Sequence, residues 1–354
     1  MEVFERHDRA VVSGGTGLTV WSNATTVLTE LGLGEELTAR SERVRAGRSV
    51  DQDDRVIYEM TPERFLWRGA APAISISRGD LIDALFTAVE KAGVPIHLGR
   101  RCAGYRQVGD GPGARVELEF EDGERVLGAA LVGADGIRSR VLAAMHGGPP
   151  QPHYTGRSTF RGVCPSAQGL EPGLVYMFHD SASGAGGGAW HVGGDRVAWT
   201  LSQKMPPGPR DEPGVAKQRA VQLVSGLPGL PSRLVHATGA DDVMRTDIFY
   251  HDWREKWGDG PVTLIGDAAH AMPTEFGQGA CQAVEDAVVL ADSIATSPDV
   301  LSGLRDYERR RLPRVKWVRD QVFKLVKWPK VGNRALQWLI NYVIAPPVVA
   351  LNPV

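Results

Sequence analysis

Cysteine, net charge and long apolar runs are scarce in this sequence, and each scarcity excludes a class of protein. The three cysteines, Cys102, Cys164 and Cys281, show no metal-ligand spacing and no even-numbered framework, so we expect no metal site and no disulfide, as in a cytoplasmic protein. A formal net charge of −2 does not predict a nucleic-acid partner, which usually needs a strongly basic balance. No apolar run reaches the roughly 18 residues of a transmembrane helix, and the charged, Gly-rich start does not predict a signal peptide. The chain has 42% hydrophobic residues, which is enough to bury a full core. With these classes excluded, small molecules are the expected partners.

The opening stretch MEVFERHD also lacks what its own pattern requires. Val3–Phe4 is a short β-prone run that ends at an acid, Glu5, and in nucleotide-binding folds such an acid binds a ribose hydroxyl at the end of the second strand. A first strand and a Gly-x-Gly-x-x-Gly turn should precede it by about 20 residues. The SGGTG run at 13–17 does not replace them, because it follows the acid and no strand of proper length precedes it. The sequence therefore predicts a nucleotide-binding fold whose first strand is missing.

Two kinds of hydrophobic pattern alternate along the chain and predict an α/β fold with a second lobe inserted into it. Residues 1–150 alternate short strands with helices. Between 151 and 246 the pattern changes to alternating strands such as RVAWTLS, broken by the Gly-rich SASGAGGGA, which predicts a sheet-rich lobe. The α/β pattern returns over 247–300, and 301–354 is predicted to be a C-terminal helical segment.

Local signals place individual elements within this plan. The segment 22–37 has apolar residues at helical spacing, with Ser22 or Asn23 as the expected cap. A strand through Ile76 leads into a helix that should end at Gly93, and the Asp-Gly pair at 122–123 predicts a hairpin. One stripe of the C-terminal helix should pack on the α/β domain while lysines face water. This stripe consists of Val315, Val318, Val322 and Leu325. The apolar end LQWLINYVIAPPVVALNPV is expected to cover a substrate entrance or to make a dimer contact.

The stretch VTLIGDAAHAMPTEFGQGACQAVEDAVVLADSI carries the strongest chemical signal. A buried strand ends in Gly266-Asp267, and a loop punctuated by glycine leads into a helix. A carboxylate at the carboxyl end of a strand can accept hydrogen bonds from ligand hydroxyls, while Gly277 and Gly279 let the backbone approach a planar ring. The helix start would favour negative charge on that ring. The alternative is a capped helix with glycines as turn residues. The expected apolar stripe of this helix is Ala280, Val284, Ala287 and Ala291.

Two shorter motifs carry weaker signals. In LVGADGIRSRV a strand is followed by Asp135-Gly136 and by Ser139 near the start of a helix. Asp135 could hold a ribose or order the loop, although an Asp-Gly pair after a strand is often only a turn. In ISRGDL, Arg78 lies between strand and helix, where it is either a phosphate or carbonyl ligand or simply solvated.

Taken together, EVFER, ISRGDLIDAL, LVGADGIRSRV and GDAAHAMPTEFGQGACQAVEDA occur in an order that resembles the class A flavoprotein monooxygenases, the aromatic-hydroxylase group. Weaker similarities, such as YTGRSTFRGV and YERRRLPRV, extend the likeness to about Arg314. The resemblance implies a Rossmann-like FAD-binding domain of the glutathione reductase type with an inserted β-sheet substrate domain. It implies these cofactor-binding residues: Glu5, Arg6, Arg78, Cys102, Asp135, Gly136, Asp267, Pro273, Gly277, Gly279 and Ala280.

Within that resemblance each residue has an expected role. Glu5 would bind the adenosine ribose with Arg6 nearby, Arg78 would contact FAD, and Asp135 would belong to the motif shared by FAD and NAD(P)H. Asp267 would hold the ribityl chain. Pro273 would flank the isoalloxazine, and the backbone N–H groups of Gly279 and Ala280 would donate to its pyrimidine edge.

The resemblance also implies the reaction. NAD(P)H would reduce FAD, O2 would form a flavin C4a-hydroperoxide, and this would hydroxylate or epoxidise an aromatic or polycyclic small molecule held by the inserted lobe. A phenolic substrate would need a base, for which His179, His191 and His251 are candidates, although a strand histidine is more often merely hydrogen-bonded. The candidate substrate-lining residues are Met177, Phe178, Trp190, Trp199 and Phe276. They can equally form the core of the lobe.

The missing first strand leaves a second hypothesis open. That strand and its glycine turn bind the FAD pyrophosphate, so FAD affinity should suffer without them. Either the sequence begins at an internal methionine of an ordinary monooxygenase, or the short chain catalyses a non-redox cyclisation or isomerisation, or acts as a scaffold. A monomer and a homodimer are both compatible with the sequence.

Overall fold

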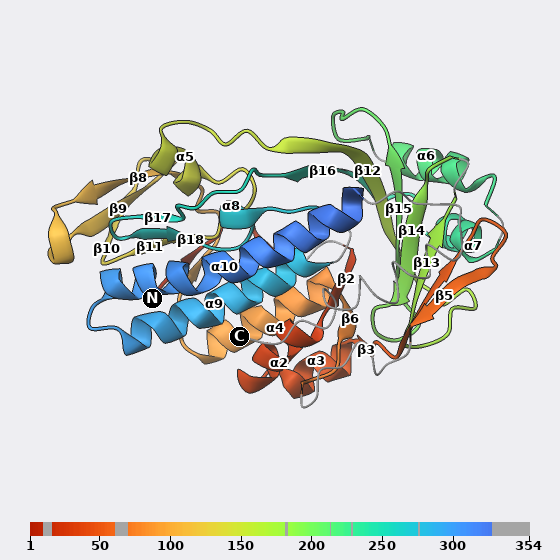
Figure 1. The fold of residues 1–354 in the computed structure, drawn as a ribbon, viewed down its shortest axis with the longest axis horizontal. Coiled ribbons are helices and arrows are strands. Elements are labelled where there is room, and N and C mark those ends of the chain that lie inside the picture. The colour runs from red at the N-terminus through yellow and green to blue at the C-terminus, as the bar shows by residue number, and fades with distance from the viewer. Residues whose placement is uncertain are drawn as a thin grey trace.

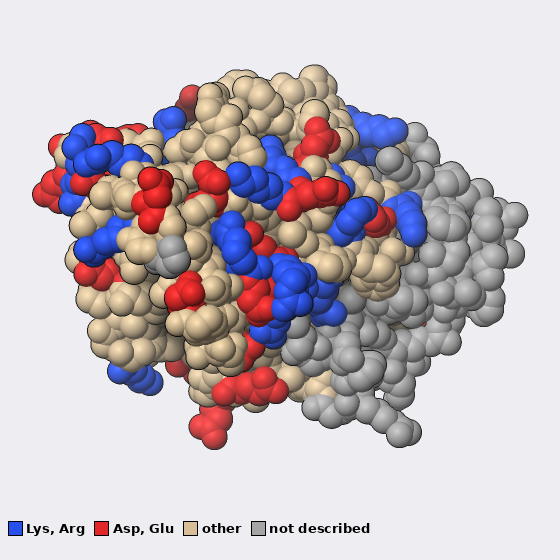
Figure 2. All heavy atoms as spheres, turned by 60° about the vertical axis from the view of Figure 1, so that its left-hand side comes forward, with Lys and Arg blue, Asp and Glu red and all other residues tan. Residues whose placement is uncertain are grey.

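The computed structural model describes residues 1–9, 16–60, 70–180, 183–212, 214–227, 229–274 and 277–327. Figure 1 shows helices and short strands at one end and a large β-sheet at the other, with two long strands running between them. This is the expected mixed α/β architecture. On the face that Figure 2 presents, basic and acidic side chains are interspersed, so that view shows no extended patch of one sign.

The large sheet has seven strands in the order β16-β12-β15-β14-β13-β4-β5. Its strands are β4 (Ala46–Val50), β5 (Val56–Met60), β12 (His153–Cys164), β13 (Leu174–His179), β14 (Gly186–His191), β15 (Val197–Lys204) and β16 (Val243–Tyr250). Helices α6 (Val215–Val224) and α7 (Leu230–Ala237) share a core with one face. The sheet also takes in β4 and β5, which precede the predicted insertion at 151–246, because β4 pairs in parallel with β13.

Short sheets make up the other end of the molecule. The parallel pair β1 (Val3–Phe4) and β7 (Ile96–His97) forms one, and β11 (Leu131–Gly133), β18 (Val262–Leu264) and β17 (Gly258–Asp259) form another. The remaining two are β8 (Cys102–Val108) with β9 (Arg115–Phe120) and β10 (Arg125–Gly128), and β2 (Gly17–Val20) with β6 (Ile74–Ser77) and β3 (Glu42–Arg43). Among the described residues β1 pairs only with β7, and β11 only with β18. No described strand joins these two parallel pairs.

The helices confirm most local predictions, with two corrections. Helix α4 (Arg78–Lys91) stops just before Gly93, which has a positive φ of 68°, and the predicted hairpin joins β9 to β10. The predicted helix at 22–37 is instead two helices, α2 (Ser22–Glu30) and α3 (Gly34–Arg40), because Gly32 adopts a φ of 83° between them. Ser22 and Asn23 do not cap α2, since Trp21 occupies the cap position and both side chains are buried.

Helices α9 (Gln278–Thr296) and α10 (Val300–Lys327) pack on β11 and β18, together with α5 (Arg140–His146) and α8 (Asp267–His270). In α10 the predicted valine stripe is confirmed, because Val315, Val318 and Val322 are fully buried; the side chain of Leu325 and residues 328–354 lie outside the description. In α9 the predicted stripe is wrong. Its alanines at 280, 287 and 291 are exposed, whereas the buried face carries polar residues. None of the described helices is both long and apolar enough to cross a membrane.

Candidate functional site

Asp267 opens α8 directly after β18, at the carboxyl end of a parallel strand. The preceding residue, Gly266, has a φ of 58°, and its N–H donates to Oδ2 of the buried Asp286 at 2.9 Å. Asp286 also bonds Nε2 of His270 at 2.6 Å. The Asp267 turn, residues 266–270, is therefore fixed by hydrogen bonds to the buried carboxylate of Asp286.

The carboxylate of Asp267 is available to a ligand. The side chain is exposed, and the described residues offer it no hydrogen-bond donor. Although solvent reaches the side chain, the surrounding protein partly desolvates the carboxyl and raises its pKa, and the neighbouring His270 and His251 oppose this rise. A bound hydroxyl-bearing ligand would supply the missing donors.

The start of α9 lies beside this carboxylate. A Cβ added at Gly279 would lie 3.9 Å from Oδ1 of Asp267, and one at Gly277 would lie 3.2 Å from Nε1 of Trp21. Gly277 has a φ of 61°, which disfavours a side chain. The N–H of Trp21 in turn contacts Sγ of Cys281 at 3.4 Å. The end of β2, the start of α9 and the Asp267 turn therefore meet at one place, where Ala280 is exposed on the first turn of α9.

Asp135 orders its own loop. Its carboxylate accepts hydrogen bonds from the hydroxyl of Ser139, from the N–H of Arg140 at 2.6 Å and from the N–H of Val141 at 3.2 Å. This corresponds to the second of the two roles that the sequence allowed. Gly136 has a φ of 80° in the same loop. Burial and the nearby Asp135 raise the pKa of the Cys102 thiol to about 11, so Cys102 is a protonated neighbour of this loop.

The adenosine-side candidates lie elsewhere. Glu5 follows β1 and its Oε1 accepts the N–H of His7 at 2.8 Å, while Arg6 is exposed and contacts the same histidine. Arg78 begins α4, with an exposed side chain. No described contact joins these three to Asp267 or Asp135. Pro273 is buried just beyond α8, and Phe276 lies outside the described residues.

The large sheet has two faces of different character. We define the inner face by Val175, Met177, Trp190, Ala198 and Thr200, and the outer face by Tyr176, Phe178, Trp199 and Leu201. A Cβ at Gly17 in β2 would lie 2.3 Å from Cβ of Ala198 and 3.0 Å from Nε1 of Trp190, so β2 packs on the inner face. Since β2 also contacts the start of α9, the inner face is the one next to the Asp267 turn.

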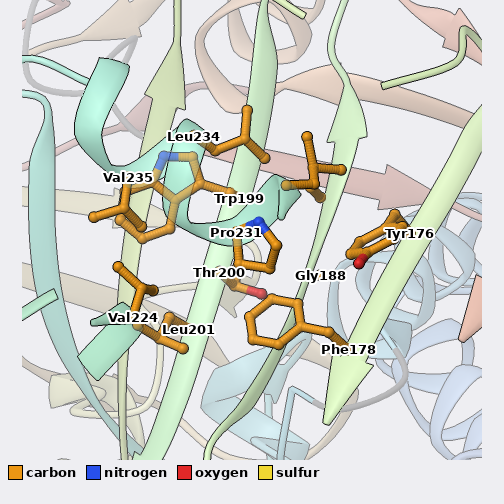
Figure 3. Close-up of a pocket in the computed structure, with 12 residues that line it drawn as sticks. Tyr176, Phe178, Gly188, Trp199, Thr200, Leu201, Val224, Pro231, Leu234 and Val235 are labelled. Carbon is orange, nitrogen blue, oxygen red and sulfur yellow. The ribbon is translucent and has the colours of Figure 1, made fainter. Parts of the chain in front are cut away.

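Two of the predicted substrate-lining residues are on the other face. Phe178 and Trp199 pack against α6 and α7, where they line a cavity of about 10 Å³ together with Leu234 and Val235 (Figure 3). That volume is about the space of one water molecule. The indole N–H of Trp199 donates to Thr238 at 2.8 Å. We therefore correct Phe178 and Trp199 to core residues, while Met177 and Trp190 remain on the inner face.

The three histidines have different surroundings. His191 is buried on the outer face, with Nε2 3.0 Å from the carbonyl of Leu170 and Nδ1 3.3 Å from that of Gly194, so the structure gives it no access to the inner face. His179 alternates with Phe178 and therefore lies on the inner face, at the end of β13. His251 lies between the Asp135 loop and α8.

Sequence reasoning missed a buried polar network beneath the Asp267 turn. Arg311 of α10 is fully buried and its guanidinium bonds Asp286 at 2.7 Å, Glu285 at 2.6 Å and the side chain of Gln282 at 2.8 Å. Asn23 of α2 donates to Glu285 at 2.7 Å. Burial alone would raise the pKa of Asp286, but His270 and Arg311 hold it below its usual value. In the sequence, the only signals of this network were the acids of QAVEDA and the arginines of YERRR. Both belong to stretches that resemble the family, but the sequence assigned them no role.

Comparison with known proteins decides the family. A family model described as an FAD binding domain matches residues 2–322. The aurachin C monooxygenase/isomerase of Stigmatella aurantiaca is 30% identical over 354 aligned positions, covering 94% of this chain and 90% of that protein. The chain belongs to the FAD-dependent monooxygenases. It is an oxidoreductase of the class A flavoprotein group that its motifs resemble.

A second relative matches only part of the chain, and a solved structure matches nearly all of it. The zeaxanthin epoxidase of Nicotiana plumbaginifolia is 33% identical over 216 residues, covering 57% of this chain but only 32% of that protein. Among solved structures, HpxO of Klebsiella pneumoniae in complex with FAD and uric acid superimposes with a TM-score of 0.82 at 23% identity, over 98% of this chain and 88% of that one. This likeness shows a shared fold.

The residues around the Asp267 turn fit the flavin half of FAD. Asp267 presents acceptors that the described residues leave without donors. Gly279 offers an open approach, since an added Cβ would meet no described atom closer than 3.9 Å, and Gly277 faces β2 and Trp21. A polyol chain bonded to the carboxylate would place a flat ring system beside the start of α9 and the inner face.

Proposed function

We propose that this FAD-dependent monooxygenase uses NAD(P)H and O2 to transfer one oxygen atom to an aromatic or polycyclic small molecule on the inner face of the large sheet. The observation that carries the proposal is the position of β2, which packs on the inner face through Gly17 and on the start of α9 through Trp21. The start of α9 and the Asp267 turn, which are our proposed flavin site, are thereby neighbours of the inner face. The relatives support the chemistry, because two of their names describe a monooxygenase and an epoxidase.

FAD, when bound, would accept a hydride from NAD(P)H and activate O2. The overall balance is substrate, O2, NAD(P)H and a proton in, and oxygenated product, NAD(P)⁺ and water out. The protein contributes position and the exclusion of water. Asp267 would accept hydrogen bonds from the ribityl hydroxyls of bound FAD, and the backbone N–H groups of Gly279 and Ala280 would orient the pyrimidine edge of its ring.

On the substrate side, Met177 and Trp190 provide an apolar surface. His179 lies on the same face and is our proposed base for a phenolic substrate. Because uric acid is bound in the HpxO structure, a flat heteroaromatic ring is a reasonable class to test first. A non-redox isomerisation is the second candidate, favoured by the isomerase activity in the name of the aurachin relative.

An absorbance spectrum of the purified chain before and after addition of FAD tests the proposal. We expect a flavin spectrum that persists through desalting, and NADH or NADPH oxidation that an aromatic substrate stimulates. A folded chain that stays colourless after FAD is added would contradict redox catalysis. The search would then move to isomerisation, measured with the same panel of compounds and no reductant.

A further inference from the structure

The two ends of the molecule are connected by a paired ribbon. Strands β12 and β16 carry the chain into and out of the large sheet (Figure 1). They pair antiparallel, with His153 opposite Tyr250 and Tyr154 opposite Phe249, and their register shifts between Tyr154 and Ser158. His251 is the first residue after β16. It therefore lies where the chain leaves the large sheet and returns to the end of the molecule that contains the Asp135 loop and the Asp267 turn.

His251 bonds three separate elements at this junction. Its ring Nε2 lies 2.7 Å from the carbonyl of Ile137 in the Asp135 loop. Its backbone N–H donates to the carbonyl of Ala271 at the end of α8, at 3.1 Å. Its own carbonyl accepts a hydrogen bond from Nη2 of Arg319 in α10, at 2.9 Å. The side chain is buried, with the residue only 1% exposed.

The hydrogen bond to Ile137 fixes the tautomer of the neutral ring. A carbonyl oxygen can only accept, so Nε2 carries the hydrogen and Nδ1 is bare in the neutral ring. Nδ1 is buried, and the described part of the chain offers it no hydrogen-bond partner. Burial lowers the pKa of His251, Arg254 and His153 lower it further, and the Ile137 carbonyl and Asp267 oppose this. A neutral ring that donates from Nε2 is therefore the form present near neutral pH.

We propose that His251 is a positioning residue that sets the spacing between the Asp135 loop and the Asp267 turn, and so shapes the FAD site. The His251 side chain holds the Asp135 loop through the carbonyl of Ile137, and the His251 backbone holds the Asp267 turn through the carbonyl of Ala271. Because β16 ends at Tyr250, the same residue couples the large sheet to both loops. This role differs from that of a catalytic base, since Nε2 of the ring donates to a loop carbonyl. The inference rests on the proposed FAD-dependent function for its binding measurement.

A pair of amide variants tests the reach of the side chain. The amide nitrogen of Gln lies close to the position of the His Nε2 and can donate to Ile137, whereas that of Asn falls about one methylene short. We therefore compare His251→Gln with His251→Asn, both made in the full chain. The matched control is His191→Asn, because His191 is also buried and also bonds a backbone carbonyl through Nε2, but on the outer face.

Two measurements are made on each variant. The first is the dissociation constant for FAD by fluorescence titration, and the second is amide hydrogen exchange in 134–140 and 266–272 without FAD. Loss of a buried hydrogen bond to a carbonyl corresponds to about a 10-fold change. We expect His251→Asn to weaken FAD binding about 10-fold and to speed exchange in both segments. His251→Gln should stay within about twofold of the parent, and His191→Asn should leave both readouts unchanged.

Two results would overturn the proposal. One is equal behaviour of the Gln and Asn variants, and the other is parental exchange in both segments of His251→Asn. If the parent chain itself does not bind FAD, the proposed function fails, and the exchange measurement alone decides the role of His251. In that case, faster exchange in the Asn but not the Gln variant still supports the coupling of the two loops.

Discussion

Asp267 is the residue on which the flavin-binding proposal depends most. Asn keeps the size of Asp but removes the charge and one acceptor oxygen. Hydrogen bonds to charged groups contribute about 1.5–3 kcal/mol each, so Asp267→Asn should raise the Kd for FAD at least about 10-fold. Fluorescence titration with FAD measures this. Asp259→Asn, at an exposed ion pair with Lys256, is the control and should bind like the parent; the same affinity in Asp267→Asn would remove Asp267 from the site.

His251 also makes a prediction about pH. Burial lowers the pKa of its ring below the usual 6.5, so the unfolded chain takes up a proton before the folded chain does. The contribution of this group to the free energy of unfolding therefore has its full value above about pH 6.5. It decreases as the pH falls from there toward the lower pKa of the folded state. In His251→Gln this part of the pH dependence should vanish. Urea unfolding at pH 7.5 and pH 5.5 measures it, and equal pH dependence in both proteins would contradict the prediction.

At the scale of elements, the contact between α9 and α10 is unusual because its centre is ionic. Arg311 faces Glu285 and Asp286, and all three side chains are fully buried. Removing one partner of such a group leaves uncompensated buried charge, which typically costs about 3–5 kcal/mol. We expect Arg311→Met to lower the free energy of unfolding by about that amount, measured by chemical denaturation.

The control for α10 is Arg309→Ala, which breaks an ion pair with Asp306 on the solvent side of the helix, where the arginine side chain is 76% exposed. Exposed pairs contribute about 0–1 kcal/mol, so this variant should unfold almost like the parent. A small effect of Arg311→Met, comparable with that of Arg309→Ala, would show that the buried network contributes little to stability. The network also supports the Asp267 turn, since Asp286 accepts a hydrogen bond from the N–H of Gly266.

At the scale of the whole molecule, the two faces of the large sheet give separate predictions: one for stability on the outer face and one for our proposed substrate binding on the inner face. Trp199 fills the core against α7, and truncating a buried Trp typically costs about 3–5 kcal/mol, so Trp199→Ala should show its effect in denaturant unfolding. Met177 lies on the inner face. Met177→Ala should mainly change the KM for the organic substrate in steady-state assays. An unchanged KM together with a large loss of stability would place Met177 in the core as well.

Short-range patterns predicted the parts of the site that are contiguous in the sequence. The strand, the Gly266-Asp267 turn and α9 follow one another, as do β11, Asp135 and Ser139, so strand–turn–helix spacing was sufficient to find them. The polar face of α9 could not be predicted in this way. Glu285 has partners 26 positions away at Arg311 and 262 positions away at Asn23, and a buried acid looks like a solvated one until its partners are known.

The sequence by itself determined the class of the protein and the chemical motifs, because those depend on residue type and on spacing within single strand–turn–helix units. Only the tertiary structure decided which residues share a surface. Alternation along β13 and β15 shows that Phe178 and Met177 lie on opposite faces of the sheet, as do Trp199 and Thr200. It does not show which face packs against α6 and α7 and which packs against β2. The role of His251 was hidden for the same reason. Its partners come from three distant segments, and hydrogen bonds between distant segments exist only once the chain has packed.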